Sequence, residues 1–568
     1  NILPFGQNTS RRLWRSATPS ASLSGRGAMA EAVLSRGYSQ VDEESKPPRT
    51  YKDVEWAFAF VAHLVGVVAI AAAFLPELLA RSRAGATDDA DASANATADA
   101  SATDPQVVAA LNHALSLSLP FVGVGIAVGL AWAVVWITIV QAFAKQLIYV
   151  SLFAPPVFFG LTALSLVGSG AIMPALLVAM LGGFFLFYAL WILRHPWRVQ
   201  FAQLCLTTVS AVIKKYPGTY MAAFASIVPA TVYHLGLFAA FTSTYSYYST
   251  RAETITHVDE QGHVYKGKDI GFAGKALMAF LALSLYWSAQ VINNVVHVTN
   301  SGVVATWYFM QHNMPASPTA GSLRRALSTS FGSICLGSLL VALVQLLRNA
   351  VENAKRNSGE SPIAMVILCC VSCFVGILEW LLELFNHWAF VQVAIYGKDF
   401  KTAAKDTMQL VKSKGLDGLV NMNLTGAAVG LGATIGALLT GGVVALASYH
   451  PLLSPAAQDS GLSDSAKSVY TIAFALVIVV SVLLAIFFAS MVSSTVTSGT
   501  TTLFVCFAED PAALQASNRE LHDRFEQITA EYLAEHPYDG PMPSTNGHPA
   551  GPPVAQHMYG SGGAPPPY

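Results

Sequence analysis

Polar and aromatic side chains recur at helical spacing within two apolar stretches of the chain, residues 275–299 and 363–390. Positions three or four residues apart lie on one face of an α-helix, so each set predicts a polar stripe along one helix. The first stripe, with its neighbouring Trp, consists of Tyr286, Trp287, Gln290, Asn293, Asn294 and His297. The second consists of Glu379, Trp380, Glu383 and Asn386.

These residue types fit the binding of a small organic cation. A quaternary ammonium group makes no strong hydrogen bonds, so it is bound by aromatic faces, at about 2 kcal/mol or more each when desolvated, and by a nearby carboxylate. The stripes supply such groups in Tyr286, Trp287, Trp380, Glu379 and Glu383. A hydroxyl on the same ligand needs one amide partner, available from Gln290, Asn293 and Asn294. The stripes therefore predict a substrate site.

Each stripe also has a structural interpretation. Asn, Gln and His side chains that point inward join membrane helices by hydrogen bonds, and aromatic residues form belts at membrane surfaces. In that case Glu379 or Glu383 pairs with Arg348 or caps a helical turn. The sequence leaves both interpretations open.

The composition sets the class of protein that carries these stripes. The 568 residues are 53% apolar and 11% charged, whereas about a quarter of the residues of a soluble protein are charged. The chain is therefore an integral membrane protein. Its net charge of -1 excludes a large basic surface for nucleic acid. The six cysteines lie in or beside apolar runs, which argues against a disulfide framework.

Ten apolar runs are long enough to cross roughly 30 Å of hydrocarbon, which takes about 20 residues. They lie near residues 55–79, 119–143, 147–168, 172–193, 218–248, 275–299, 327–346, 363–390, 424–448 and 468–491. Lys and Arg are more frequent in the two tails and in the connections on their side, so the tails are expected in the cytosol. We expect an all-α polytopic bundle of about ten spans with both termini cytosolic.

The segments outside the spans differ in composition. The acidic loop after the first span contains the sequon Asn95-Ala96-Thr97, so we expect this loop outside the cytosol and glycosylation at Asn95. Four regions follow from these patterns: a disordered segment 1–50, a transmembrane domain 51–510, a cytosolic amphipathic helix 511–536 and a disordered Pro/Gly-rich tail 537–568.

The start of the chain has two interpretations. The first 28 residues are rich in Arg and Ser and contain no acid, which is typical of an organelle transit peptide. They are equally consistent with translated upstream sequence before Met29 as the true start, the interpretation we favour. Residues 197–216 and 399–414 are amphipathic rather than spanning, and we expect both at the cytosolic surface.

Four ordered blocks make the chain comparable with a known family. They read YWSAQVINNVVHVT (286–299, continuing to GVVATWYF at 302–309), GSICLGSLL (332–340, continuing to QLLR at 345–348), NHWAFVQVAIYGK (386–398) and LFVCFAED (503–510). Together they resemble the choline transporter-like family, in the form of its fungal and plant members, over about residues 51–511. The resemblance implies a multi-spanning protein with cytosolic termini. Animal members are implicated in the uptake of choline and ethanolamine, while the substrates of fungal and plant members are less settled.

These observations predict a transporter of choline or a related small organic cation, in the plasma membrane or an endomembrane, with the first favoured. A monovalent cation that crosses to a negative interior gains about 2.3 kcal/mol per 100 mV, so facilitated alternating access needs no ATP and no cofactor. A non-transporting membrane scaffold and a carrier of a different small solute are the alternatives. The chain carries no HExxH or GxSxG motif, so we do not expect an enzyme.

The chain ends in Pro565-Pro566-Pro567-Tyr568, which matches the PPxY ligand of WW domains. Such a ligand is a preformed polyproline II segment with a terminal aromatic anchor. The sequence predicts a WW-domain partner through Pro565, Pro566 and Tyr568. A Pro-rich tail that ends in Tyr by chance is the alternative.

Overall fold

The computed structural model describes residues 50–95, 105–258, 264–356, 362–414, 417–453 and 463–535. The N-terminal segment expected to be disordered, the Pro/Gly-rich tail and the PPxY motif lie outside the described residues, and these predictions stay open. The sequon begins at Asn95, the last residue of the first described helix. The other two residues of the sequon, Ala96 and Thr97, lie outside the described residues.

The described chain is almost entirely helical. The long helices are α2 (Val54–Asn95), α3 (Pro105–Gly168), α4 (Ile172–Leu193), α7 (Ile227–Thr250), α8 (Gly271–Met310), α10 (Phe331–Arg356), α11 (Pro362–Tyr396), α13 (Asp417–Leu453) and α14 (Asp464–Glu509). The shorter ones are α5 (Pro196–Lys215), α6 (Gly218–Ala225), α9 (Pro318–Ala326), α12 (Phe400–Lys414), α15 (Pro511–Ser517) and α16 (Arg519–Glu535). The sequence did not predict the antiparallel hairpin β1 (Glu253–Val258) and β2 (Val264–Asp269) between α7 and α8.

Within the described residues, nine helices are long and apolar enough to cross a membrane. The apparent difference from ten spans arises in α3, whose apolar part runs over 60 residues. At 1.5 Å per residue such a helix would be about 90 Å long, far more than one bilayer. Phe143 breaks it with non-helical dihedrals (φ -121°, ψ 26°), so α3 contains two of the expected spans. The all-α polytopic bundle is confirmed.

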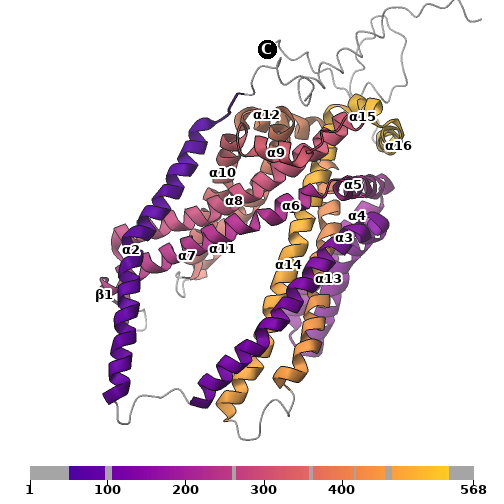
Figure 1. Cartoon of the computed structure of the whole chain (residues 1–568). Coiled ribbons are helices and arrows are strands. Elements are labelled where there is room, and N and C mark those ends of the chain that lie inside the picture. Colours follow the sequence, from indigo (N-terminus) through magenta and orange to yellow (C-terminus); the bar gives the residue numbers. More distant parts are fainter. Residues whose placement is uncertain are drawn as a thin grey trace, which may run out of the picture.

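The long helices form two groups (Figure 1). The first bundle consists of α2, α7, α8, α10 and α11, and the second of α3, α4, α13 and α14, as their mutual contacts show. In the figure the two groups approach each other at the end that carries α5, α9, α12, α15 and α16. The charge distribution predicts that all five of these segments are cytosolic, so we call this end the cytosolic end.

Small residues let the second bundle pack closely. The indole N–H of Trp132 donates to the Gly432 carbonyl (2.8 Å), and that of Trp136 donates to the Val429 carbonyl (3.0 Å). A Cβ added at Gly432 would lie 2.2 Å from the Trp136 ring, and one at Gly436 would lie 2.4 Å from the Trp132 ring. Glycine is therefore required where α13 crosses α3.

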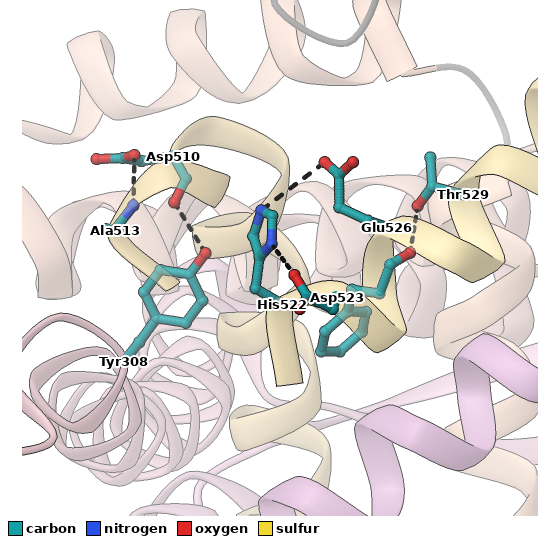
Figure 2. Close-up of polar contacts among 8 residues, drawn as sticks. Tyr308, Asp510, Ala513, His522, Asp523, Glu526 and Thr529 are labelled. Carbon is teal, nitrogen blue, oxygen red and sulfur yellow. Dashed lines mark hydrogen bonds and ion pairs between the residues drawn. The ribbon is translucent and has the colours of Figure 1, made fainter. Parts of the chain in front are cut away.

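The segment 511–536, expected as one helix, forms two. Asn518 separates α15 from α16 (φ -153°, ψ 86°), and its side-chain oxygen accepts from Leu521 N at 3.0 Å. Asparagine is a favoured N-cap residue because this bond satisfies a free N–H of the first turn, so a new helix begins there. Figure 2 shows Asp510 capping α15 through Ala513 N (3.0 Å) and accepting from the Tyr308 hydroxyl of α8 through its carbonyl (2.8 Å).

Candidate functional site

The stripe on α8 faces α10 over most of its length. The Trp287 indole donates to the Cys335 carbonyl (3.0 Å), and the Asn294 amide donates to the Ser338 hydroxyl (2.9 Å). Tyr286 accepts through its hydroxyl from the Asn349 amide. Trp287 is also buried against the Phe60 ring of α2, with ring centroids 5.1 Å apart. These contacts hold α8 inside the first bundle.

The stripe on α11 faces the same helix from the other side. Asn386 donates to the Gly337 carbonyl (2.7 Å), and Glu383 accepts from the Gln345 amide (3.2 Å). Glu379 accepts from the Arg348 guanidinium at 2.6 Å, the ion pair named above as the structural alternative. Most residues of the two stripes therefore bond to α10, although α8 and α11 also contact each other directly.

Three predicted residues take no part in these contacts with α10. Trp380 is 49% exposed on the surface of α11, beside the exposed side chains of Ile377 and Leu381. Such an apolar surface on a spanning helix faces lipid. Asn293 is exposed and Gln290 half-buried on α8. The structure does not bring these side chains into a common site with Trp287.

His297 has a different environment from the rest of its stripe, because it touches both bundles. Its Nε2 donates to the His387 carbonyl of α11 (2.9 Å), and its Nδ1 lies within hydrogen-bonding distance of the Ser498 hydroxyl of α14 (2.8 Å). Its ring stacks on His387 at 3.7 Å between centroids. One turn further, the Asn300 amide donates to the Thr495 hydroxyl at 3.3 Å. We call His297, Asn300, His387, Thr495 and Ser498 the bundle boundary.

Sequence reasoning missed most residues of the bundle boundary. The last expected span ends at residue 491, whereas α14 continues to Glu509. Between residues 493 and 502 eight of ten residues are Ser or Thr, a run of hydroxyls in a long helix that was the available signal. Hydroxyl side chains can bond to the carbonyl one turn back, so they do not interrupt the helix. They also leave small polar groups for a neighbouring helix.

Buried polar atoms with unused hydrogen-bonding capacity lie in the bundle boundary and at the neighbouring residue Asn386 of α11. Within the described residues, Asn300 Oδ1, Asn386 Oδ1 and His387 Nε2 are buried and have no hydrogen-bond partner. An unsatisfied buried group costs about 1–3 kcal/mol, so each such atom needs an explanation, such as a ligand or a bound water. Acceptor atoms of this kind suit a ligand with a hydroxyl or a positive charge.

One pocket lies away from both stripes, at the cytosolic end. Its volume is about 350 Å³, and it is bounded by α5, the end of α8 and α16. Lys215 and Arg524 line it together with Trp307 and Gln311. Glu520, which pairs with Arg524, lines the pocket as well. The residues that line this pocket include none of the stripe residues, so it is not the site that the stripes predict.

The fold and these contacts define a class of protein: a polytopic helical membrane protein whose two bundles meet at a polar layer. Residues 177–512, more than half of the chain, match the family described as plasma-membrane choline transporter. The chain belongs to this family, and the resemblance seen in its sequence blocks is confirmed.

Curated relatives are fungal proteins named Protein PNS1. That of Gibberella zeae is 34% identical over 358 residues (62% of each chain), and that of Eremothecium gossypii is 33% identical over 352 residues (60% of this chain, 59% of the relative). The Saccharomyces cerevisiae protein is 30% identical over 429 residues (74% and 75%). The chain thus spans about three fifths of the length of the first two relatives and three quarters of the third.

Proposed function

We propose that the chain carries choline or a related small organic cation across its membrane by facilitated, potential-driven alternating access. The observation that supports this best is the bundle boundary, where α8 and α11 of the first bundle meet α14 of the second. Carriers commonly hold their substrate between two helical groups that move against each other around a fixed site. Membership of the family points to the same function.

The substrate contacts that we propose lie at this boundary. The unpartnered oxygen of Asn300, and that of Asn386 next to the boundary residue His387, can accept from a ligand hydroxyl or interact with a positive charge. Aromatic faces lie close by, since the rings of Trp388 and Phe504 are 5.2 Å apart across α11 and α14. Aromatic faces and carbonyl oxygens together suit a quaternary ammonium that carries a hydroxyl.

The carboxylates of α11 have a supporting role in this proposal. Glu383 is exposed and accepts only an amide hydrogen bond in the contacts described above, so its charge is available to attract a cation toward α11. Glu379 is neutralised in part by Arg348. A substrate role for the other stripe residues stays a prediction, because the structure gives them contacts with α10 or an exposed or half-buried position outside the boundary: Tyr286, Trp287, Gln290, Asn293, Asn294 and Trp380.

The driving force in this proposal is the membrane potential. A monovalent cation gains about 2.3 kcal/mol for each 100 mV it crosses toward a negative interior. This corresponds to roughly fortyfold accumulation, since 1.4 kcal/mol is a factor of ten. A plasma-membrane location places this potential in the direction of uptake.

The test is uptake of radiolabelled choline by cells that lack their own high-affinity choline carrier and express the full chain. Ser498→Ala is compared with Ser468→Ala at matched surface levels. Both serines lie on α14 and bond to the carbonyl four residues back, but only Ser498 also contacts His297. We expect saturable uptake that falls several-fold in Ser498→Ala and is unchanged in Ser468→Ala.

Two outcomes count against the proposal in different ways. Absence of uptake, with the chain at the cell surface, rejects choline as the substrate. It favours the alternatives, a carrier of another solute or a membrane scaffold. Equal uptake in the two serine variants retains the carrier but moves its substrate site away from the bundle boundary.

A further inference from the structure

The carboxylate of Glu509, at the last residue of α14, joins the two bundles at the cytosolic end. Its Oε1 accepts from the Gln392 amide and its Oε2 accepts from the Tyr396 hydroxyl at 2.8 Å. Both donors lie on α11 of the first bundle, and Gln392 is fully buried. A single carboxyl group of the second bundle is therefore held by two donors of the first.

The segment after α11 fixes the orientation of one donor. Gly397 adopts φ 64°, which ends α11 and turns the chain back over its own last turn. The Lys398 ammonium then donates to Gln392 Oε1 at 3.0 Å and pairs with Asp406 of α12 at 2.7 Å. Because Lys398 occupies the amide oxygen of Gln392, the amide NH₂ is left for Glu509.

The contacts between the bundles are concentrated toward this end. On α8, every residue from 295 to 309 is buried, whereas Leu285 and Phe272 nearer the other end are exposed. On α11, Trp388 packs on Phe504 of α14, while side chains near residue 377 are exposed. Figure 1 shows the same arrangement, with the two groups of helices closest at the cytosolic end.

We propose that Glu509, with Gln392 and Tyr396, is the cytosolic gate of this carrier. The inference rests on the proposed alternating access, and it adds which residues must separate before the bundle boundary opens to the cytosol. The structure is closed at this end, because Glu509, the last residue of α14, is bonded to the last turn of α11, on the cytosolic side of the boundary residue Ser498. Release of a substrate into the cytosol then requires that Glu509 leave both donors.

The experiment measures access to the boundary rather than transport. Ser498→Cys places a thiol of similar size at the boundary, and a membrane-impermeant maleimide is applied to inside-out vesicles. Modification at position 498 is quantified by mass spectrometry in this background alone and with Glu509→Gln, Tyr396→Phe or Glu520→Gln. The last is the matched control, since Glu520 is an exposed carboxylate at the same end that pairs with Arg524 of its own helix.

We expect modification at position 498 to be at least tenfold faster in Glu509→Gln, a few-fold faster in Tyr396→Phe and unchanged in Glu520→Gln. The buried native Cys205 of α5 reports on the fold, and it must stay unmodified in every variant. An unchanged rate in both Glu509→Gln and Tyr396→Phe, with Cys205 protected, overturns the gate.

The result is separable from the proposed function. Uptake is measured in chains that retain Ser498, because substitution of Ser498 is itself expected to lower uptake. Faster modification without choline uptake supports the gate and rejects the substrate. Normal uptake with unchanged modification rejects the gate and leaves the transport proposal standing.

Discussion

Residues 271–294 and 295–310 of α8, which we call its first and second halves, carry the same kinds of polar residue but use them differently. In the first half, Trp287 and Asn294 bond to α10, a neighbour within the first bundle. In the second half, His297 and Asn300 bond to α14 of the other bundle. Polar side chains in a membrane helix therefore serve either to hold a bundle together or to join two bundles, and the partner helix decides which.

Burial follows the same division. Residues 295–309 are buried on every face, whereas the first half of α8 has exposed positions such as Asn293. A helix with one exposed face belongs to the rim of a bundle, and one buried all round lies at the centre of the molecule. We expect substitutions in the first half to affect stability and those in the second half to affect transport.

The largest effect is expected at Gly499, where α14, α5 and α8 meet. A Cβ added there would lie 2.4 Å from Val209 and 3.4 Å from Val304. Overpacking of a core typically costs about 1–3 kcal/mol and shifts backbones, so Gly499→Val should reduce both folded protein and uptake by tenfold or more. Gly430→Val, at a position with open space, is the control. Size-exclusion chromatography of the detergent-solubilised protein measures the first quantity, and a monodisperse, active Gly499→Val would contradict the packing.

The next effect is expected at Asn300. In Asn300→Ala the contact with Thr495 and the unpartnered oxygen are both lost. A lost hydrogen bond to a ligand corresponds to about 1 kcal/mol or more, so the KM for choline should rise about five- to tenfold while folded protein remains at the wild-type level. A loss of folded protein at unchanged KM would assign Asn300 to packing instead.

A smaller effect, on stability alone, is expected at Trp287. Trp287→Phe keeps the aromatic packing on Phe60 but removes the bond to the Cys335 carbonyl. One hydrogen bond contributes about 0.5–1.5 kcal/mol, so thermal unfolding in detergent should shift downward by a few degrees with KM unchanged. If KM rises instead, Trp287 contacts the substrate as the sequence pattern predicts.

The smallest effect is expected for Glu379. The Glu379 side chain is 12% exposed and its partner Arg348 is 53% exposed, and ion pairs whose basic partner reaches solvent contribute about 0–1 kcal/mol. Glu379→Gln should therefore leave stability and uptake close to wild type, whereas Glu383→Gln, which removes a charge without a basic partner at hydrogen-bonding distance, should lower the affinity for the cation. A collapse of uptake in Glu379→Gln alone would restore Glu379 as a substrate ligand.

Part of the site was predictable because helical periodicity is a local property. The spacing of Tyr286, Asn294 and His297 placed them on one face of α8, and the structure has all three bonding to neighbouring helices from that face. The spacing carried no information on which helix that face meets. For the same reason the pairing of Glu379 with Arg348 stayed one of several possibilities until the structure placed α10 beside α11.

The sequence by itself determined the class of the protein. Apolar runs of bilayer length with few charges allow only helices, because helices satisfy their backbone hydrogen bonds internally. The ordered sequence blocks identified the family. The tertiary structure decided which helices the polar side chains contact. The Ser/Thr run of α14 lies beyond the apolar run that marked its span, and its meaning appears only when α14 packs against the second half of α8. Side-chain hydrogen bonds between helices depend on contacts between residues about 200 positions apart in the chain, which no local pattern encodes.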